Sequence, residues 1–351
     1  MPLIFILLSC ALASTLVPAI LYFAHSKGIY DKLSARKIHN GNIPRLGGVG
    51  ITLAFLATVV VMKLFQAPLA EEFSNNYPIW PILASGIAMF SIGLIDDLID
   101  LRARFKFIIE ALIAIFLIAW GFRFQAVSVP WGDGGLELGL LSWPVTFLWI
   151  IGITNAMNLI DGLDGLAGGV AFIASMTFGL FFWTQGSIMS AQLCFAVSGS
   201  VAGFLIFNLP PAKIFMGDSG SLFLGFCLAI LPLLSQGKAR PEIGIISAST
   251  VLAIPIFDTL SAMYRRTKAH VSFFTADNGH FHHVLLRMVQ LSSSVLLIIC
   301  GINVLLALAA LSTLFLSQAL SFSIKLGALA AIGIVFYAIN RRSIKDGSFP
   351  E

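Results

Sequence analysis

The sequence predicts an all-α protein that crosses a membrane many times, and three observations support this fold class. Hydrophobic residues make up 58% of the 351-residue chain. Charged residues make up only 11%, against about 25% in an ordinary soluble domain. The apolar residues also fall into long runs, and a membrane helix needs about 20 of them in succession. A chain of this composition lacks the charge to cover a water-soluble core.

Eleven membrane-spanning helices are predicted from these runs. No linker, repeat or low-complexity tract divides the sequence, so residues 1–351 are predicted to form a single integral membrane domain. An odd number of spans places the two chain ends on opposite sides of the membrane. The predicted spans are approximately 2–24, 47–66, 79–95, 107–121, 143–158, 166–185, 188–208, 221–236, 242–263, 294–315 and 320–340.

Lysine and arginine residues predict the orientation of these spans, because both are enriched in cytoplasmic loops. One set of alternate connections carries sixteen of the 21 Lys and Arg residues. We therefore expect the N-terminus outside and the C-terminus in the cytoplasm. In the outer connection after the fourth span, alternating apolar residues flank Gly132-Asp133-Gly134-Gly135. That pattern predicts a small extracytoplasmic β-hairpin.

Acidic residues gather in three separate connections on the predicted cytoplasmic side. Asp96 and Asp97 end the third span, Asp161 and Asp164 follow the fifth, and Asp218 precedes the eighth. Two adjacent carboxylates at a helix C-terminus oppose the helix dipole, so a bound cation explains them better than a solvated helix end. Oxygen ligands of this kind favour Mg²⁺, which also binds substrate phosphates. Mn²⁺ is an alternative metal.

Each acidic group also has a structural interpretation. Asp161 and Asp164 could be ordinary loop residues, although their spacing does not match a calcium-binding EF-hand. Asp218 could cap the helix that follows it, which is compatible with metal binding. The sequence favours a metal site because the three groups converge beside most of the positive charge. A metal combined with Lys and Arg suits phosphate groups, whereas the small net charge of +4 does not predict nucleic-acid binding.

Six motifs resemble those of the polyprenyl-phosphate N-acetylhexosamine-1-phosphate transferases. They occur in the family order, and they look most like the bacterial undecaprenyl-phosphate N-acetylglucosamine-1-phosphate transferases. The last motif departs from the three consecutive histidines of phospho-N-acetylmuramoyl-pentapeptide transferase, which remains the alternative within the family. The motifs are Lys37-Ile-His39 with Pro44-Arg45-Leu-Gly47-Gly48; Asp96-Asp97; Asn155-x-x-Asn158-x-x-Asp161-Gly162-Leu163-Asp164-Gly165; Phe215-Met-Gly217-Asp218-Ser219-Gly220-Ser221; Met263-Tyr264-Arg265-Arg266; and His280-Phe281-His282-His283.

The resemblance implies that undecaprenyl phosphate attacks the sugar-linked phosphorus of a UDP-N-acetylhexosamine and releases UMP. It places the protein in the bacterial inner membrane, with its active site on the cytoplasmic face, at the start of a cell-envelope glycan such as an O-antigen. The implied catalytic residues are Asp96, Asp97, Asp161 and Asp164, and the implied metal ligands are Asp218, Asp164 and Asp97. The implied substrate-binding residues are Lys37, His39, Arg45, Asn155, Asn158, Gly162, Leu163, Phe215, Arg265, Arg266, His280, His282 and His283.

Several alternatives remain open from the residues alone. Asp96 and Asp97 could position the lipid phosphate, accept its proton or form a covalent phosphate intermediate. The three histidines could contact phosphate or sugar, lie on the surface, or bind zinc, although no cysteine is near to complete a closed zinc site. A transporter of an anionic substrate is the rival class, but it would place its ionisable residues near the bilayer midplane. A homodimer is compatible with the sequence.

Overall fold

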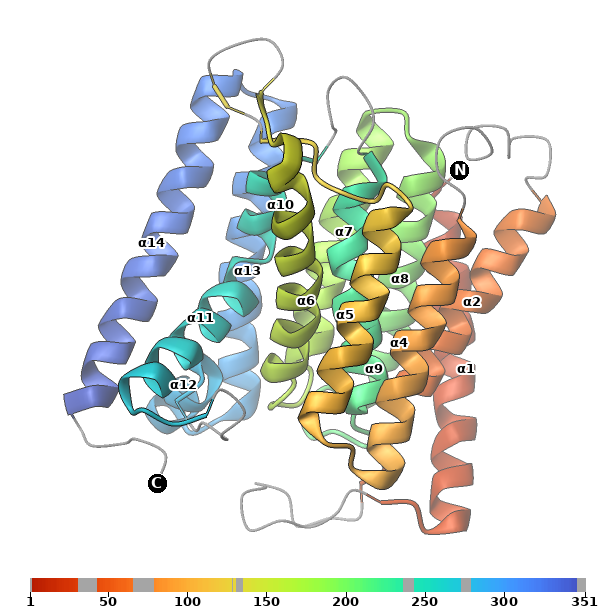
Figure 1. Ribbon diagram of the computed structural model, residues 1–351. Helices are drawn as coiled ribbons and strands as arrows, with labels where there is room; N and C mark the ends of the chain where they lie inside the picture. The colour runs from red at the N-terminus through yellow and green to blue at the C-terminus, as the bar shows by residue number, and fades with distance from the viewer. Residues whose placement is uncertain are drawn as a thin grey trace.

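The computed structural model describes residues 2–30, 43–65, 79–127, 129–130, 135–235, 243–272 and 279–345. Most of its helices run side by side between two ends of one bundle (Figure 1). The N-terminal helix begins at the upper end in Figure 1, and α14 finishes at the lower end. The predicted binding residues Lys37 and His39 lie outside the described residues.

The first part of the bundle contains α1 (Ile4–Lys27), α2 (Gly47–Phe65), α4 (Trp80–Ile99), α5 (Ala103–Ala119) and α6 (Ser142–Ile160), which the short η2 (Gly139–Leu141) precedes. It continues with α7 (Leu166–Thr184), α8 (Ile188–Asn208), α9 (Gly217–Ile230) and the 3-10 helix η3 (Leu231–Ser235). The last part contains α10 (Ile245–Val251), α11 (Ala253–Lys268), α12 (Phe281–Val289), α13 (Ser292–Leu311), η4 (Ser312–Leu314) and α14 (Gln318–Lys345).

Helix length and composition confirm a polytopic membrane protein. Among the described residues, nine helical segments are long and apolar enough to cross a membrane, and a tenth forms if α10 and α11 make one bent span. The predicted span 107–121 falls on α5, whose 17 residues are fewer than the roughly 20 that a membrane crossing requires. The total of eleven crossings therefore remains a prediction.

The predicted ninth span, 242–263, differs from the structure because it is not one continuous helix. Helices α10 and α11 meet at an angle of 81°, with Leu252 between them. Pro255 lies in the first turn of α11, where a proline is tolerated. Proline has no backbone N–H to donate to the carbonyl of Val251, so a continuous helix would lose a hydrogen bond at this point. The bend directs the last turns of α11 toward the lower end of α14 (Figure 1).

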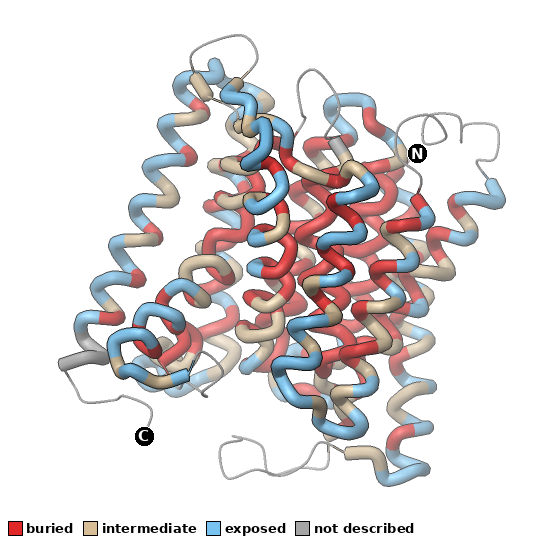
Figure 2. Tube along the Cα trace, in the orientation of Figure 1, coloured by how far each residue is buried: buried red, intermediate tan, exposed pale blue. Residues whose placement is uncertain are grey.

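Helix α9 lies at the centre of the bundle. Of the residues Gly217–Leu234, 94% are buried, whereas only 11% are buried in an 18-residue stretch of the outer Gln318–Arg341 (Figure 2). The first turn of α9 crosses α2 and α4 closely because glycines meet there. A Cβ added to Gly48 would clash with the backbone of Gly220, and one added to Gly93 would clash with the carbonyl of Asp218. Glycine is the residue that permits such close helix crossings.

Two short strands lie between α5 and α6. Ala126–Val127 (β1) pairs antiparallel with Leu136–Glu137 (β2), so that Ala126 lies opposite Glu137. This pairing occurs where the hairpin was predicted, although residues 131–134 of its turn lie outside the described part of the chain. The extracytoplasmic position of the hairpin stays a prediction.

Candidate active site

The segments 44–48 and 215–216 lie side by side at the lower end of the bundle because their backbones are hydrogen bonded. The N–H of Gly47 donates to the carbonyl of Phe215, and the N–H of Phe215 donates to the carbonyl of Pro44, each over 2.9 Å. Gly217 then takes a φ of 75°, which glycine adopts at little cost. This backbone pairing brings two motifs that are far apart in the sequence to the start of α9.

Asp97 caps α9 with both of its carboxylate oxygens. The N–H of Asp218 donates to Oδ1 over 2.8 Å, and the N–H of Ser219 donates to Oδ2 over 2.9 Å. The first N–H groups of a helix have no partner within the helix, and its dipole favours negative charge there. The Asp97 side chain is only 1% exposed. This predicted metal and catalytic residue therefore positions the start of α9.

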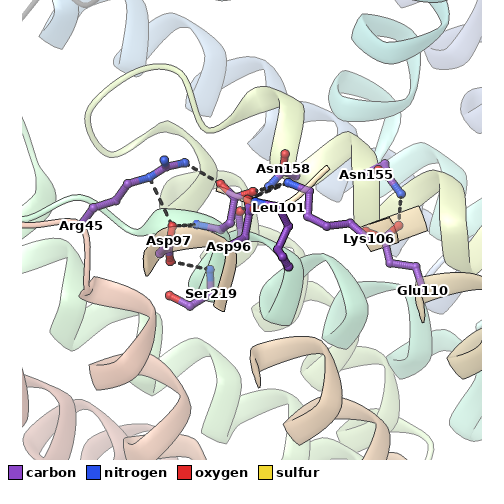
Figure 3. A network of polar contacts seen from close by, with 11 residues as sticks. Arg45, Asp96, Asp97, Leu101, Lys106, Glu110, Asn155, Asn158 and Ser219 are labelled. Carbon is purple, nitrogen blue, oxygen red and sulfur yellow. Dashed lines mark hydrogen bonds and ion pairs between the residues drawn. The ribbon is translucent and has the colours of Figure 1, made fainter. Parts of the chain in front are cut away.

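Asp218 lies between two cationic side chains. Nη2 of Arg45 donates to its Oδ1, and Nε of Arg45 lies 3.4 Å from Oδ1 of Asp97. Nζ of Lys106 lies 2.8 Å from both Oδ2 of Asp218 and Oδ2 of Asp96. Figure 3 shows Arg45 and Lys106 on opposite sides of the acidic residues. We call these five residues the carboxylate network, and its cations offset the cost of burying three carboxylates together.

A row of polar side chains extends the carboxylate network along α6. Asn155 and Asn158 are three residues apart and therefore lie on the same face of the helix. Nδ2 of Asn155 donates to Oε2 of Glu110 over 2.5 Å, and Nδ2 of Asn158 donates to Oγ of Ser221 over 2.9 Å. Both predicted asparagines thus connect α6 to its neighbours, α5 and α9 (Figure 3).

The two acids of the α6–α7 turn have different surroundings. Asp164 is buried, and its Oδ2 accepts the N–H of Ala212 over 3.0 Å, so it holds the following loop in place. Asp161 is half-buried and forms no side-chain hydrogen bond or ion pair with a described residue. Burial is the main cause that raises the pKa of Asp161 to about 7, and Arg45 opposes this rise. Asp161 is the carboxyl group of this turn that is available to a ligand.

The histidine motif meets the same turn from the other side of the bundle. His282 is 2% exposed, and neither of its ring nitrogens has a hydrogen-bond partner within the described chain. A Cβ added to Gly162 would lie 2.5 Å from its Nε2. Burial is the main cause that lowers the pKa of His282 to about 3, so its ring is neutral near pH 7. We call the rings of His280, His282 and His283 the histidine face.

Asp258 orients this histidine face from α11. Its Oδ2 lies 2.8 Å from Nδ1 of His280, and its Oδ1 accepts the backbone N–H of Phe281 over 2.8 Å. The rings of His280 and His282 are stacked, with centroids 5.9 Å apart. The centroids of His282 and His283 lie 4.2 Å apart. A single carboxylate on α11 therefore holds both the first residue of α12 and the ring of His280, which directly precedes that helix.

Other predicted binding residues have contacts that stabilise the fold. Arg265 and Arg266 are buried near the end of α11, and Nη1 of Arg265 donates to Oδ1 of Asn340 over 2.6 Å. That contact joins α11 to α14. Leu163 packs into the hydrophobic core, and Phe215 contributes its backbone to the pairing with segment 44–48.

The predicted magnesium ligands are not gathered into one group. Within the described residues, no three His, Cys, Asp or Glu side chains are close enough together to hold a metal ion. Asp97 and Asp164 accept backbone N–H groups, whereas Asp218 and Asp96 share the ammonium group of Lys106. Two carboxylates that converge on one cation are hard oxygen donors of the kind that Mg²⁺ prefers. The donor chemistry therefore fits a divalent cation best at Asp218 and Asp96.

Two residues of the site were not predicted as site residues from the sequence. Lys106 was used only to orient the spans, although it follows Asp96 and Asp97 closely and precedes an apolar run. Asp258 interrupts the predicted ninth span, and an ionisable residue within a membrane span is a functional candidate by default. Asp258 stands out from the sequence as an acid near the predicted cytoplasmic end of its span, and Lys106 follows two aspartates, but the partners of both residues became visible only in the structure.

Comparisons with known proteins place this site in a family. A model described as glycosyl transferase family 4 matches residues 79–236. A relative from Bacillus subtilis (strain 168), named "Probable undecaprenyl-phosphate N-acetylglucosaminyl 1-phosphate transferase", is 37% identical over 271 residues, 77% of this chain and 73% of the relative.

Two further relatives are each named "Undecaprenyl-phosphate alpha-N-acetylglucosaminyl 1-phosphate transferase". The protein from Yersinia pestis is 32% identical over 74% of this chain and 70% of its own length. The protein from Escherichia coli (strain K12) is 30% identical over 75% of this chain and 71% of its own length. On this similarity and on the motifs gathered around α9, the chain belongs to the glycosyl transferase family 4 of polyprenyl-phosphate N-acetylhexosamine-1-phosphate transferases.

Proposed function

We propose that this protein transfers N-acetylglucosamine 1-phosphate from UDP-N-acetylglucosamine to undecaprenyl phosphate and releases UMP. The product is a lipid-diphosphate-linked sugar that starts a cell-envelope glycan. The carboxylate network is the observation that carries the proposal. It brings two cationic side chains and three carboxylates together at one end of a membrane bundle. The names of the relatives support the donor sugar and the lipid acceptor.

The reaction exchanges one phosphate bond for another. An oxygen of the lipid phosphate attacks the sugar-linked phosphorus of the donor and forms a new P–O bond. The anhydride bond between the two donor phosphates breaks, and its electron pair leaves on the phosphate oxygen of UMP. Both substrates are anionic, since a phosphate monoester alone carries about −1.5 to −2 charges at pH 7. The protein therefore contributes mainly positioning and charge neutralisation.

Arg45 and Lys106 are the described cations best placed for this neutralisation. The Arg45 side chain is 39% exposed and the Lys106 side chain 19% exposed, although each contacts a buried carboxylate. A phosphate can thus approach either group from solvent. Arg45 carries a planar guanidinium, the group that pairs most directionally with phosphate, whereas Lys106 acts as a point charge between two aspartates.

Magnesium is proposed as the cofactor, with Asp218 as its principal ligand and Asp96 as the neighbouring carboxylate. The ion would neutralise the diphosphate of the donor, and Mn²⁺ is expected to substitute for it. Asp97 and Asp164 support this site by holding the start of α9 and the loop after α8, respectively. This assignment changes the predicted ligand set, because two of its three aspartates accept backbone N–H groups instead.

For Asp97, positioning is favoured over covalent catalysis. Both of its oxygens already accept N–H groups from the first turn of α9. An oxygen that attacked phosphorus would lose its negative charge and accept its N–H group more weakly. A direct attack by the lipid phosphate is consistent with this geometry. Isolation of an aspartyl-phosphate at Asp97 after quenching would contradict it.

The active site is proposed to face the cytoplasm of a bacterial inner membrane. The connections that carry most of the basic residues lie at the same end of the bundle as the carboxylate network (Figure 1). A cysteine introduced at Asn40 should therefore resist an impermeant thiol reagent in whole cells, and one introduced at Asn75 should react. The reverse labelling pattern would overturn this orientation.

One assay tests the function and its nearest alternatives. The purified protein is given undecaprenyl phosphate with either UDP-N-acetylglucosamine or UDP-N-acetylmuramoyl-pentapeptide, and UMP release is measured. Preference for the pentapeptide donor would reassign the substrate within the family. A substrate flux in sealed vesicles without UMP release would favour the transporter class instead.

A further inference from the structure

We propose that Asp258 is a positioning residue that acts on the reaction through His280. Its carboxylate holds the ring of His280 and thereby sets the histidine face toward the α6–α7 turn. The effect on catalysis rests on the proposed transferase function, whereas the effect on the ring of His280 does not. Asp258 is 2% exposed and lies on α11, so it reaches the histidine motif across 22 residues of sequence.

The contact is a two-point attachment. Oδ1 of Asp258 accepts the N–H of Phe281, the first residue of α12, over 2.8 Å. His280 occupies the N-cap position but makes no side-chain cap hydrogen bond. Asp258 thus supplies from another helix the acceptor that the cap residue does not. Its second oxygen lies 2.8 Å from Nδ1 of His280, so backbone and ring are held by the same group.

This attachment determines which ring nitrogen of His280 can meet a ligand. A carboxylate is an acceptor only, so Nδ1 must carry the proton of the shared hydrogen bond. Nε2 is then left to face other groups, and a neutral ring offers it as an acceptor. Without Asp258, the ring could rotate or change its tautomer. Outer partners of this kind orient functional histidines in many sites.

Ring packing connects the orientation of His280 to the α6–α7 turn, which carries Asp161 and Asp164. The rings of His280 and His282 are stacked at an interplanar angle of 15°. His282 in turn packs against Gly162, the neighbour of Asp161, whose carboxylate has no partner among the described residues. A turned His280 ring would therefore disturb the stack that packs against the turn. We expect binding of the donor's sugar to be affected, since the carboxylate network around α9 is assigned to the phosphate groups of both substrates.

A double-mutant cycle separates this role from simple helix capping. In Asp258→Asn, the amide oxygen can still accept the N–H of Phe281, but the charge that selects the His280 tautomer is lost. We expect kcat/KM for UDP-N-acetylglucosamine to fall on the order of 10- to 100-fold, as for other outer partners of functional histidines. The KM for the lipid acceptor should not change. In a His280→Ala background, adding Asp258→Asn should have no further effect, because the two residues act as one unit.

Thr259→Val is the matched control on the same helix. Its hydroxyl oxygen has no hydrogen-bond partner in the described chain, and valine preserves its shape, so its kcat/KM should stay within about twofold. Losses that multiply in the Asp258→Asn, His280→Ala double variant would show that Asp258 acts independently of His280. Unchanged kinetics of Asp258→Asn would also overturn the proposal.

Nitrogen NMR of labelled histidine reads the ring directly, with the signals of His280 assigned by their loss in His280→Ala. Asp258→Asn should move the Nδ1 signal of His280, and Thr259→Val should not. An unchanged spectrum in Asp258→Asn would overturn the positioning role even in a protein that releases no UMP. Absence of UMP release from the wild-type protein with every UDP-sugar would refute the transferase function separately.

Discussion

Two helices of this protein begin at a carboxylate that another helix supplies. Asp97 of α4 accepts the first N–H groups of α9, and Asp258 of α11 accepts the first N–H of α12. Asp97 lies beside the cation Arg45, whereas Asp258 lies beside the ring of His280. The same capping device therefore supports two chemically different surfaces.

The comparison indicates a division of labour between the two regions. The carboxylate network can neutralise phosphates because Arg45 and Lys106 remain partly exposed. The histidine face offers ring nitrogens that pair with hydroxyl or amide groups, and such pairing is how a site rejects analogues that lack those groups. The cationic side chains of the carboxylate network would then lower the barrier to phosphate transfer. The hydrogen-bonding groups of the histidine face would select the sugar.

Asp218→Asn should have the largest effect and abolish turnover. An amide cannot offset the charges of Arg45 and Lys106, and it is a poor ligand for a divalent cation. UMP release from UDP-N-acetylglucosamine in detergent, with and without added magnesium, is the measurement. Activity near that of wild type, or full wild-type activity in excess chelator, would show that the carboxylate network is not the catalytic centre.

Lys106→Met should reduce kcat about 10²- to 10³-fold, a loss typical for one electrostatic group aimed at developing charge. It leaves Asp96 and Asp218 facing each other without the ammonium group that both contact. Lys63→Met is the control, because Lys63 is exposed at the other end of α2. Equal activities of the two variants would remove Lys106 from the mechanism.

Gly162→Ala tests whether the two regions work as one site. The new methyl group would lie 2.5 Å from Nε2 of His282, so either the turn or the histidine face must shift. A displacement of this size should lower kcat/KM about 10-fold. Gly152→Ala serves as the control on α6, since a Cβ there meets no atom within 4 Å. A Gly162→Ala enzyme as active as the Gly152→Ala enzyme would mean that contact between the regions is dispensable.

The smallest effect concerns the stability contributed by Asp161. Its pKa rises from 3.8 to about 7 on folding, mainly through burial. Between these values the folded protein retains a proton that the unfolded chain has released, so stability falls as the pH rises through this window. Asp161→Asn should therefore unfold at a temperature about 2 °C or more above wild type at pH 8. The difference should vanish near pH 4, and a difference that is constant with pH would contradict the titration.

The fold class followed from the sequence because apolar run length is a local property. Within the described residues the predicted spans fall on helical segments, and the ninth is bent by 81° between α10 and α11, with Pro255 in the first turn of α11. Lys and Arg placement predicted which connections share one end of the bundle, and the described turns between α4 and α5, α6 and α7, and α8 and α9 do lie at the same end (Figure 1). Which end is cytoplasmic still depends on labelling.

The sequence predicted the residues of the site and assigned them roles, but it did not predict their contacts. Asp96, Asp97, Asp161, Asp164 and Asp218 were expected to converge. Asp96, Asp97 and Asp218 share the carboxylate network, whereas Asp164 accepts the N–H of Ala212. The sequence could not distinguish Asp161 from Asp164, since both belong to the same Asp-x-x-Asp motif. The structure gives Asp164 a backbone N–H and leaves Asp161 without a partner among the described residues.

Spacing along the chain thus determined which residue types reach one end of the membrane bundle. Tertiary structure alone decided that Asp97 caps a helix, that Asp218 pairs with cationic side chains and that Asp161 stays available to a ligand. Asp97 caps α9 across 121 residues of sequence. Asp258 caps α12 from α11, the helix that follows the 81° bend after α10. The physical reason is that the first N–H groups of a helix can donate to a carboxylate from any neighbouring element, and helix packing selects that neighbour.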